Sequence, residues 1–333
     1  MTRVVVVGAT GNVGTSVLHA LSSDDAVDEI VAVARRVPVL RIPKTTWTAA
    51  DVESSDLVSI FRDADCVVHL AWRIQPSHDV ESLRKTNVAG SAHVFAAVAG
   101  AGVPALVYAS SVGAYSRGPK DHPVDEGWPT DGTPTSFYAR HKAEVERLLD
   151  RFEREQPNVR VVRLRPALIF KRGSAEEQRR YFLGPLFPRM LARPSAIAVV
   201  PDIPGLRFQA VHAEDVADAY RRAVVDGDAR GAFNVAADPV LDPDVLARAL
   251  SARKLPVPVT LARGAMAVSW RLRLQPTPPG WLDMGLSVPL MDTTRARTEL
   301  GWEPRYTSLA AILELLSGIR DGASSPTPVL RAQ

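Results

Sequence analysis

Tyr138 and Lys142 are the two side chains of this sequence whose types and spacing best suit proton transfer. They are four residues apart, and Val145, Leu148 and Leu149 follow at helical spacing. Residues four apart lie on one face of a helix, so a phenol and an ammonium would be neighbours. A cation beside a phenol favours the phenolate and lowers its pKa from about 10. The pair therefore predicts a general acid or base, although such a pair also arises often by chance.

A glycine-rich segment near the N-terminus predicts a second site. Residues 3–7 are a β-branched run typical of a buried parallel strand, and Gly8, Gly11 and Gly14 follow before a helical pattern over residues 17–21. Glycines let the backbone approach a pyrophosphate, and a helix N-terminus offers free N–H groups and a favourable dipole. The arrangement predicts dinucleotide binding; the alternative is a tight structural turn.

Two arginines follow the second predicted strand, residues 29–34. A dinucleotide fold usually places an acid there for the ribose hydroxyls, and this chain has Arg35 and Arg36 instead. Guanidinium groups match a 2′-phosphate, so the sequence favours NADP over NAD. The alternative is that both arginines are solvated loop residues.

The overall composition limits the classes of protein to which this chain can belong. The chain has 333 residues, 46% of them hydrophobic, which is enough for two domains or one large α/β domain. Its net charge of +3 is nearly balanced, so a nucleic-acid partner is not expected. No uncharged apolar run has transmembrane length, so we expect a soluble cytoplasmic protein without a membrane partner. The single cysteine, Cys66, excludes an intramolecular disulfide and a cysteine-based metal site, and no other metal site is expected.

Strand and helix patterns alternate through the first half of the chain. Such alternation predicts an α/β fold with a Rossmann-type, doubly wound parallel sheet. We assign residues 1–165 and 208–235 to a dinucleotide-binding domain, and residues 166–207 and 236–320 to a smaller C-terminal substrate lobe. Residues 321–333, which are rich in Ser, Pro and Ala, are expected to be disordered. The predicted strands of the first domain are residues 3–7, 29–34, 47–50, 66–71, 105–109 and 159–164.

Further polar residues lie near the edge where the strands end. Ser110 and Ser111 follow the fifth strand, at the mouth of the expected crevice. His69 and His212 stand among apolar residues, which favours structural roles over catalytic ones. Part of the substrate pocket would come from the lobe and part from a later aromatic segment around Trp270, Trp281 and Met284.

Taken together, these motifs resemble the extended short-chain dehydrogenase/reductase superfamily, in its NAD-dependent epimerase/dehydratase branch. They span residues 3–318 in the family's order. The matching motifs are Gly8-x-x-Gly11-x-x-Gly14, Asp51-Val52, His69-Leu70-Ala71, Asn87-Val88-x-Gly90, Ser110-Ser111, Tyr138-x-x-x-Lys142, Leu164-Arg165-Pro166, Val211-His212-x-x-Asp215-Val216-Ala217, Phe233-Asn234-Val235 and Leu300-Gly301-Trp302-x-Pro304.

The resemblance implies a role for each matched position. Tyr138 would exchange a proton with the substrate oxygen, Lys142 would lower the tyrosine's pKa and bind the nicotinamide ribose, and Ser111 would orient the substrate. The usual dimer of the family is a four-helix bundle of the helices that start near Gly90 and Tyr138. The positions expected around the cofactor, NADP by preference or else NAD, are Gly8, Gly11, Asn12, Val13, Gly14, Arg35, Arg36, Asp51, Val52, Leu70, Ala71, Asn87, Tyr138, Lys142 and Pro166.

The sequence also departs from the family's sugar-nucleotide members. Residues 165–170 lack the asparagine that nucleotide-sugar epimerases usually carry there, and are closer to hydroxysteroid dehydrogenases and dihydroflavonol reductases. Val112 and Gly113 occupy positions where a dehydratase usually has an acid. We therefore expect an NAD(P)-dependent oxidoreductase acting on a secondary alcohol or ketone. The alternatives are a nucleotide-sugar epimerase with retained NAD and a non-catalytic, NADP-binding regulatory protein.

Overall fold

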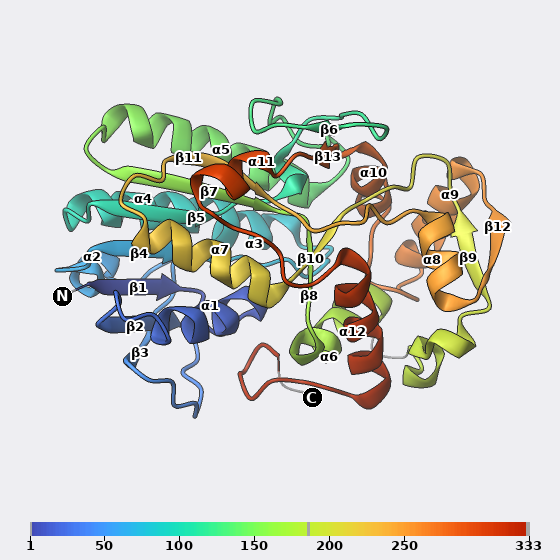
Figure 1. Ribbon diagram of the computed structural model, residues 1–333, viewed down its shortest axis with the longest axis horizontal. Helices are drawn as coiled ribbons and strands as arrows, with labels where there is room; N and C mark the ends of the chain where they lie inside the picture. The colour runs from blue at the N-terminus through green and yellow to red at the C-terminus, as the bar shows by residue number, and fades with distance from the viewer. Residues whose placement is uncertain (1, 185–186, 331–333) are drawn as a thin grey trace.

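A seven-stranded parallel sheet forms the centre of the computed structural model, which describes residues 2–184 and 187–330 (Figure 1). The strand order is β11-β7-β5-β4-β1-β2-β3, so the order reverses next to β1. Ligands of doubly wound sheets bind outside the carboxyl ends of the strands at such a reversal. The strands are β1 (Arg3–Val7), β2 (Glu29–Ala34), β3 (Thr45–Ala49), β4 (Cys66–His69), β5 (Ala105–Ala109), β7 (Arg160–Pro166) and β11 (Gly231–Val235).

Both faces of the sheet are covered by helices, which explains the apolar strands. Val4 and Val6 of β1 pack on one side and Val5 and Val7 on the other, and all four are almost completely buried. The helices of the first face are α1 (Asn12–Ser22) and α7 (Ala213–Val225), and those of the second face are α2 (Leu57–Phe61), α4 (Gly90–Gly100) and α5 (Phe137–Glu155).

The predicted fold class is confirmed, with small shifts of boundary. β4 ends at His69, so Leu70 and Ala71 begin a loop instead of ending the strand. The helix expected to start near Gly90 is the end of a longer helical segment. That segment consists of α3 (Val80–Arg84), a π-helical turn (Lys85–Ala89) and α4. Single π-turns within helices are frequent at functional sites.

A smaller lobe lies beyond the carboxyl ends of the strands (Figure 1). It contains two two-stranded parallel sheets, β8 with β10 and β9 with β12, and a third such pair, β6 with β13, covers the edge near α5. The strands are β6 (Pro123–Val124), β8 (Leu168–Phe170), β9 (Val199–Asp202), β10 (Ala210–His212), β12 (Arg253–Pro256) and β13 (Leu290–Met291). The remaining α-helices are α6 (Ala175–Gln178), α8 (Pro243–Leu250), α9 (Val259–Arg271), α10 (Gly280–Ser287), α11 (Thr294–Glu299) and α12 (Ser308–Asp321). The short 3-10 and π-helical turns are Val112–Ala114, Arg172–Ser174, Arg179–Leu183, Arg189–Ala192 and Pro194–Ala196.

Residues 322–330, which follow α12, pack against the rest of the chain, whereas the sequence predicted disorder there. Thr327 and Leu330 are both 0% exposed, and the Thr327 hydroxyl donates to the carbonyl of Thr10. The composition of the tail alone is typical of a disordered segment, and these contacts with distant parts of the chain outweigh it. The rest of that prediction, residues 331–333, lies outside the described residues.

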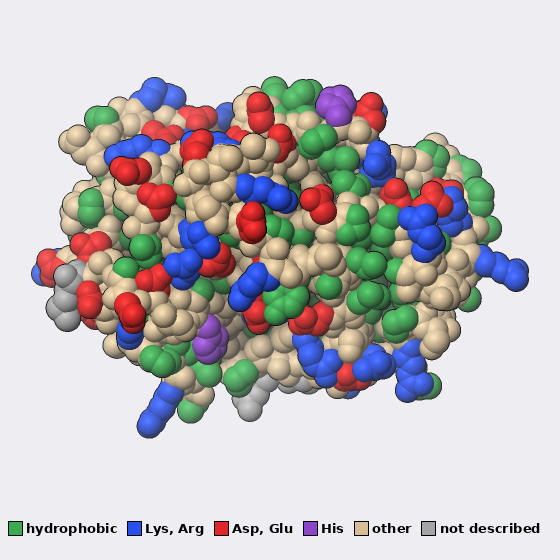
Figure 2. Space-filling view, viewed as in Figure 1, with side chains coloured by type: hydrophobic (Ala, Val, Ile, Leu, Met, Phe, Trp, Pro, Cys, Tyr) green, Lys and Arg blue, Asp and Glu red, His purple; other side chains and the backbone are tan. Residues whose placement is uncertain are grey.

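The surface carries charges of both signs. On the face shown in Figure 2, basic and acidic side chains are intermingled, as the small net charge leads one to expect. Among residues 2–184 and 187–330, no helix is long and apolar enough to cross a bilayer.

Candidate active site

The glycine turn after β1 has no room for side chains. Gly8 has a φ of +87°, and a Cβ atom there would lie 2.5 Å from the backbone nitrogen of Ala71. A Cβ atom on Gly14 would lie 2.5 Å from the carbonyl oxygen of Gly8. The turn therefore packs directly against the loop that follows β4, and α1 packs directly against the turn.

The first turn of α1 is left open to a ligand. Gly11 precedes the helix and supplies no capping side chain, so the first N–H groups, including those of Asn12 and Val13, lack an intrahelical acceptor. The N–H groups of Gly8 and Ala9 instead bind the carbonyl of Val33 in β2. Helix N-termini of this kind bind phosphate groups, so the residues present fit a dinucleotide.

Four residues of the predicted cofactor set lie just after the ends of β2 and β3. Arg35 and Arg36 are exposed, and neither makes an ion pair with any residue in the described part of the chain. The side chain of Asp51 accepts from the N–H of Glu53 at 3.0 Å, which shapes the loop after β3. Val52 is buried against α4, where a Cβ atom on Gly90 would lie 2.8 Å from its side chain.

Asn87 holds the loop after β4 and is completely buried. Its Oδ1 accepts from the N–H of Arg73 at 2.7 Å, and its Nδ2 donates to the carbonyl of the same residue at 3.0 Å. The loop that carries Leu70 and Ala71 is thereby fixed beside the glycine turn. Asn87 thus positions the loop, and the π-helical turn places its side chain there.

Ser111 and Tyr138 meet at the carboxyl end of β5. Ser111 is 7% exposed, its hydroxyl oxygen accepts from the N–H of Gly113 at 3.0 Å, and its hydroxyl acts on the nearby Tyr138 phenol to lower the pKa of that group. Tyr138 lies in the first turn of α5, which the Ser136 hydroxyl caps by accepting from the N–H of Ala139. The two predicted catalytic hydroxyls are therefore neighbours at this edge of the sheet.

Lys142 lies one helical turn beyond Tyr138 and is 3% exposed. Its Nζ donates to the carbonyl of Ala109 at 2.6 Å and lies 3.5 Å from the centre of the Trp72 ring. The centre of the Tyr138 ring is 5.9 Å away. Burial lowers the pKa of Lys142 well below its ordinary value, and the nearby Glu146 carboxylate opposes that shift.

The direction of the Tyr138 pKa shift differs from the prediction. Burial raises the pKa of Tyr138 to about 12, and only the Ser111 hydroxyl acts in the lowering direction. The predicted effect of Lys142 is absent because burial also lowers the pKa of that lysine, so it has lost its charge before the phenol titrates. Tyr138 is consequently a neutral phenol at neutral pH, a state that can donate a proton.

A buried ionic network holds α5 against the sheet. Glu146, which is 0% exposed, accepts from the Ser110 hydroxyl at 2.5 Å and from the guanidinium groups of Arg163 and Arg165 at 2.8 and 2.9 Å. Ser110 is thereby committed to the network, which leaves Ser111 as the serine that faces Tyr138. Since Glu146 follows Lys142 by one turn, the network also fixes the helix face that carries the catalytic candidates.

The model of the NAD dependent epimerase/dehydratase family matches residues 4–236. The chain belongs to this family. An uncharacterized protein of Mycobacterium tuberculosis is 27% identical over 342 residues, which cover 95% of this chain and 83% of that protein. Two solved structures show the same fold. A UDP-glucose 4-epimerase of Thermotoga maritima with UDP-glucose has a TM-score of 0.71 at 20% identity and covers 96% and 99% of the two chains. MoeE5 in complex with UDP-glucose and NAD has a TM-score of 0.69 at 20% identity, covering 97% and 100%.

In this member of the family, aromatic rings enclose the Tyr138 phenol. The Trp281 ring centre lies 5.1 Å from that of Tyr138, and the Trp72 ring meets Tyr138 edge-on at 6.1 Å. Phe182 packs edge-on against Trp281 at 5.1 Å. Of the predicted pocket residues, Trp281 and Met284 are in the site, whereas Trp270 stacks on His78 at 4.1 Å.

Sequence reasoning missed Trp72 as a residue of the site. Trp72 directly follows the matched His69-Leu70-Ala71 motif, so its position one residue beyond the motif was an available signal. Phe182 comes from a π-helical turn within residues 166–207, the part of the lobe that was expected to line the pocket. Pro166 is buried at the end of β7.

The two histidines have structural environments. The Nε2 of His69 lies 2.9 Å from the Ser91 hydroxyl, and burial lowers its pKa to about 3, so the ring is neutral. His212 caps α7 by accepting from the N–H of Glu214, and its Nε2 lies 3.2 Å from the Glu314 carboxylate. Throughout residues 2–184 and 187–330, no cluster of three metal-ligating side chains occurs.

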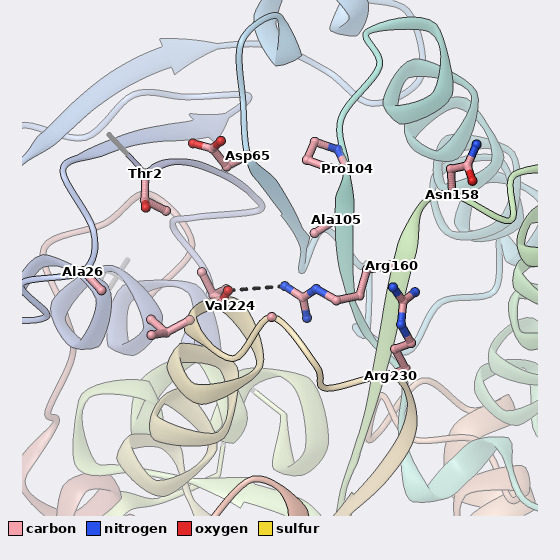
Figure 3. Close-up of a pocket in the computed structure, with 11 residues that line it drawn as sticks. Thr2, Ala26, Asp65, Pro104, Ala105, Asn158, Arg160, Val224 and Arg230 are labelled. Carbon is pink, nitrogen blue, oxygen red and sulfur yellow. Dashed lines mark hydrogen bonds between the residues drawn. The ribbon is translucent and has the colours of Figure 1, made fainter.

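A hollow of about 390 Å³ lies at the opposite, amino-terminal edge of the sheet (Figure 3). Its most buried charged residue, Arg160, donates to the carbonyls of Ala223, Val224 and Ala229 around the end of α7. That guanidinium stabilises the helix end, where unpaired carbonyls collect. The hollow is thus separate from the Ser111–Tyr138 site at the carboxyl edge.

Gly113 gives a test of how closely the site is packed. A Cβ atom there would lie 2.8 Å from the Tyr138 ring and 3.1 Å from the Met284 sulfur. We expect Gly113→Ala to displace the phenol and lower kcat by roughly 10–100-fold, because small misplacements of a catalytic group are costly. Steady-state kinetics check this, with Gly285→Ala as the control because a Cβ atom there meets open space. A kcat of Gly113→Ala equal to that of the unmodified protein would contradict the assignment of Tyr138.

Proposed function

We propose that this protein is an NAD(P)-dependent oxidoreductase that interconverts a secondary alcohol and a ketone through Ser111, Tyr138 and Lys142. The observation that carries the proposal is the Ser111 hydroxyl beside the Tyr138 phenol and the buried Lys142, at the sheet edge that also carries the glycine turn. Membership of the family supports a dinucleotide cofactor.

The site residues divide the reaction between them. The N–H groups of Asn12 and Val13 would hold the diphosphate, and Lys142 would bind the nicotinamide ribose. When bound, the cofactor supplies or accepts the hydride. The Ser111 hydroxyl orients the substrate oxygen, and Tyr138 donates a proton to that oxygen as the carbonyl is reduced. In the oxidation direction Tyr138 takes the proton back.

The surroundings of Tyr138 favour an apolar, ring-shaped substrate. Trp72, Trp281 and Phe182 present ring faces and edges, with Met284 beside them. The indole N–H groups of Trp72 and Trp281 are buried, and neither has a partner within the described part of the chain. They could therefore bind an oxygen atom on such a ring.

A nucleotide-sugar epimerase with retained NAD is the second candidate, favoured by the solved relatives that hold UDP-glucose. Dehydration is disfavoured because Gly113, packed against Tyr138, leaves no room for an acid. Purified protein should be assayed with NADPH and NADH against alicyclic and aromatic ketones, and separately with UDP-glucose. Cofactor consumption with ring ketones supports the proposal. Conversion of UDP-glucose to its epimer without cofactor consumption supports the second candidate instead.

Arg35 and Arg36 support a preference for NADP. Both guanidiniums are exposed at the end of β2 and free of ion pairs within the described residues. We expect Arg35→Ala to weaken NADPH binding roughly 10-fold and to leave NADH binding unchanged, since a charge-assisted phosphate contact contributes about 1.5 kcal/mol or more. Calorimetric titration at fixed salt measures both constants, with Arg41→Ala as a control for general charge. Equal or tighter binding of NADH by the unmodified protein would contradict the preference.

We also propose that the protein forms a homodimer through α4 and α5. The exposed face of α5 is charged, so such an interface would be polar and sensitive to salt. Light scattering at low and high salt would determine the oligomeric state. The exposed residues of that face are Arg140, Arg147, Asp150, Arg151, Arg154 and Glu155.

A further inference from the structure

Two side chains from distant parts of the chain hold the glycine turn and the start of α1. Thr327 comes from the C-terminal tail, and Lys171 follows β8 at the entrance to the lobe. They bind the carbonyls of Thr10 and Asn12, which flank Gly11. Neither residue belongs to the catalytic candidates or to the predicted cofactor set.

Thr327 is fully buried, and its hydroxyl donates to the Thr10 carbonyl at 2.8 Å. The tail around it is fixed to the lobe rather than to the sheet. The Ser325 hydroxyl donates to the Gly173 carbonyl at 3.1 Å, and Arg180 donates to the Val329 carbonyl at 3.1 Å. In Figure 1 the tail turns back from the end of α12 and passes beside α6.

Lys171 places its ammonium in the first turn of α1. Its Nζ donates to the Asn12 carbonyl at 2.5 Å and to the hydroxyls of Thr15 and Ser16 at 2.7 and 3.0 Å. The Thr15 hydroxyl in turn lies 3.2 Å from the Gly11 carbonyl, to which it donates. The carbonyls of three consecutive residues, Thr10, Gly11 and Asn12, are therefore all bound by side chains.

Without a bound anion, the position of the Lys171 ammonium at the N-terminus of α1 is unfavourable. A cation at a helix N-terminus opposes the dipole, and burial of the ammonium is unfavourable as well, which lowers its pKa to about 8. The charged groups that face it are the carboxylates of Glu177, Glu214 and Glu314. A bound diphosphate would change the sign of the effect, because an anion at the helix N-terminus is attracted by both the dipole and the ammonium.

We propose that Lys171 and Thr327 are positioning residues for the dinucleotide. They fix the carbonyls of the glycine turn, so that its free N–H groups point to the diphosphate. The C-terminal tail is in consequence a part of the cofactor site. This inference rests on the proposed function, since it concerns the same cofactor.

The test compares Thr327→Val with Thr327→Ser. Valine keeps the shape and removes the hydroxyl, whereas serine keeps the hydrogen bond. We expect Thr327→Val to weaken NADPH and NADH binding about 3–10-fold, the value of one ordinary hydrogen bond, and Thr327→Ser to stay within about twofold. Lys171→Met should weaken binding by about 10-fold or more at low salt. The melting temperature without cofactor is measured for each variant.

ADP-ribose, which carries the diphosphate and lacks the nicotinamide, is the probe that locates the effect. Its affinity should fall by the same factor as that of NADPH in each variant. Thr298→Val removes an exposed hydroxyl whose hydrogen bonds lie within α11, far from the glycine turn and the tail, and should bind like the unmodified protein. Unchanged affinity in Thr327→Val and Lys171→Met, or equal losses in Thr298→Val and Thr327→Val, would overturn the inference. If the unmodified protein bound none of the three nucleotides, the proposed function itself would fail.

Discussion

Replacing Tyr138 with phenylalanine is expected to lower kcat by about 10²–10⁴-fold and to leave cofactor affinity within about twofold. The ring still packs between Trp72 and Trp281, so only the hydroxyl beside Ser111 is removed. Because burial raises the pKa of Tyr138 to about 12, the phenol stays protonated across neutral pH. The rate of ketone reduction should accordingly be flat around neutrality and fall only in strong alkali.

Tyr108→Phe is the matched control for this experiment. Its hydroxyl is buried, has no hydrogen-bond partner among the described residues, and lies on the neighbouring strand β5. Steady-state kinetics and cofactor titrations on both variants separate chemistry from binding. Equal activity of the unmodified protein and Tyr138→Phe would remove the phenol from the mechanism. Cofactor binding without turnover in the unmodified protein would favour the regulatory alternative.

Loss of the Glu146 carboxylate is expected to give the largest change in stability. Glu146→Leu leaves Arg163 and Arg165 buried without their central partner, and removal of one member of a buried ionic network costs about 3–5 kcal/mol. Urea unfolding measures the difference, with the exposed Glu155→Leu on the same helix as control. A change below about 1 kcal/mol would show that the network contributes little.

The same ionic network makes the stability of the fold depend on pH. Hydrogen bonds and the two guanidiniums lower the pKa of Glu146 to about 2, below its ordinary value of 4.5. A lowered folded-state pKa stabilises the fold fully above the unfolded value, and that contribution is lost as the pH falls from about 4.5 towards 2. Glu146→Gln should remove this part of the acid dependence in urea titrations at several pH values.

The sequence predicted the parts of the fold that depend on local pattern. The β-branched run of β1 and the glycines after it specify a buried strand and a phosphate-binding turn from neighbouring residues alone. The Tyr138–Lys142 pair was found from helical spacing, and Ser111 from its place at the end of a strand. These are the features whose physical cause lies within a few residues of the chain.

The features that were missed depend on contacts between distant residues. Thr327 binds Thr10 across almost the whole length of the chain, and Lys171 reaches α1 from beyond β8. The pKa of Tyr138 follows from burial by the lobe, which no local pattern contains. A tail rich in Ser, Pro and Ala gives no sign of the pocket that receives its threonine.

Transfer of deuterium from labelled cofactor tests the central claim most directly. NADPH carrying deuterium at both positions of the nicotinamide C4 would be mixed with the ring ketone that the assay panel selects, and the product analysed by mass spectrometry. We predict one deuterium on the carbinol carbon of the product for each NADP⁺ released, and none with Tyr138→Phe on the same timescale. Label that stays with protein-bound cofactor while UDP-glucose is epimerised, or no transfer to any ketone, would contradict the account.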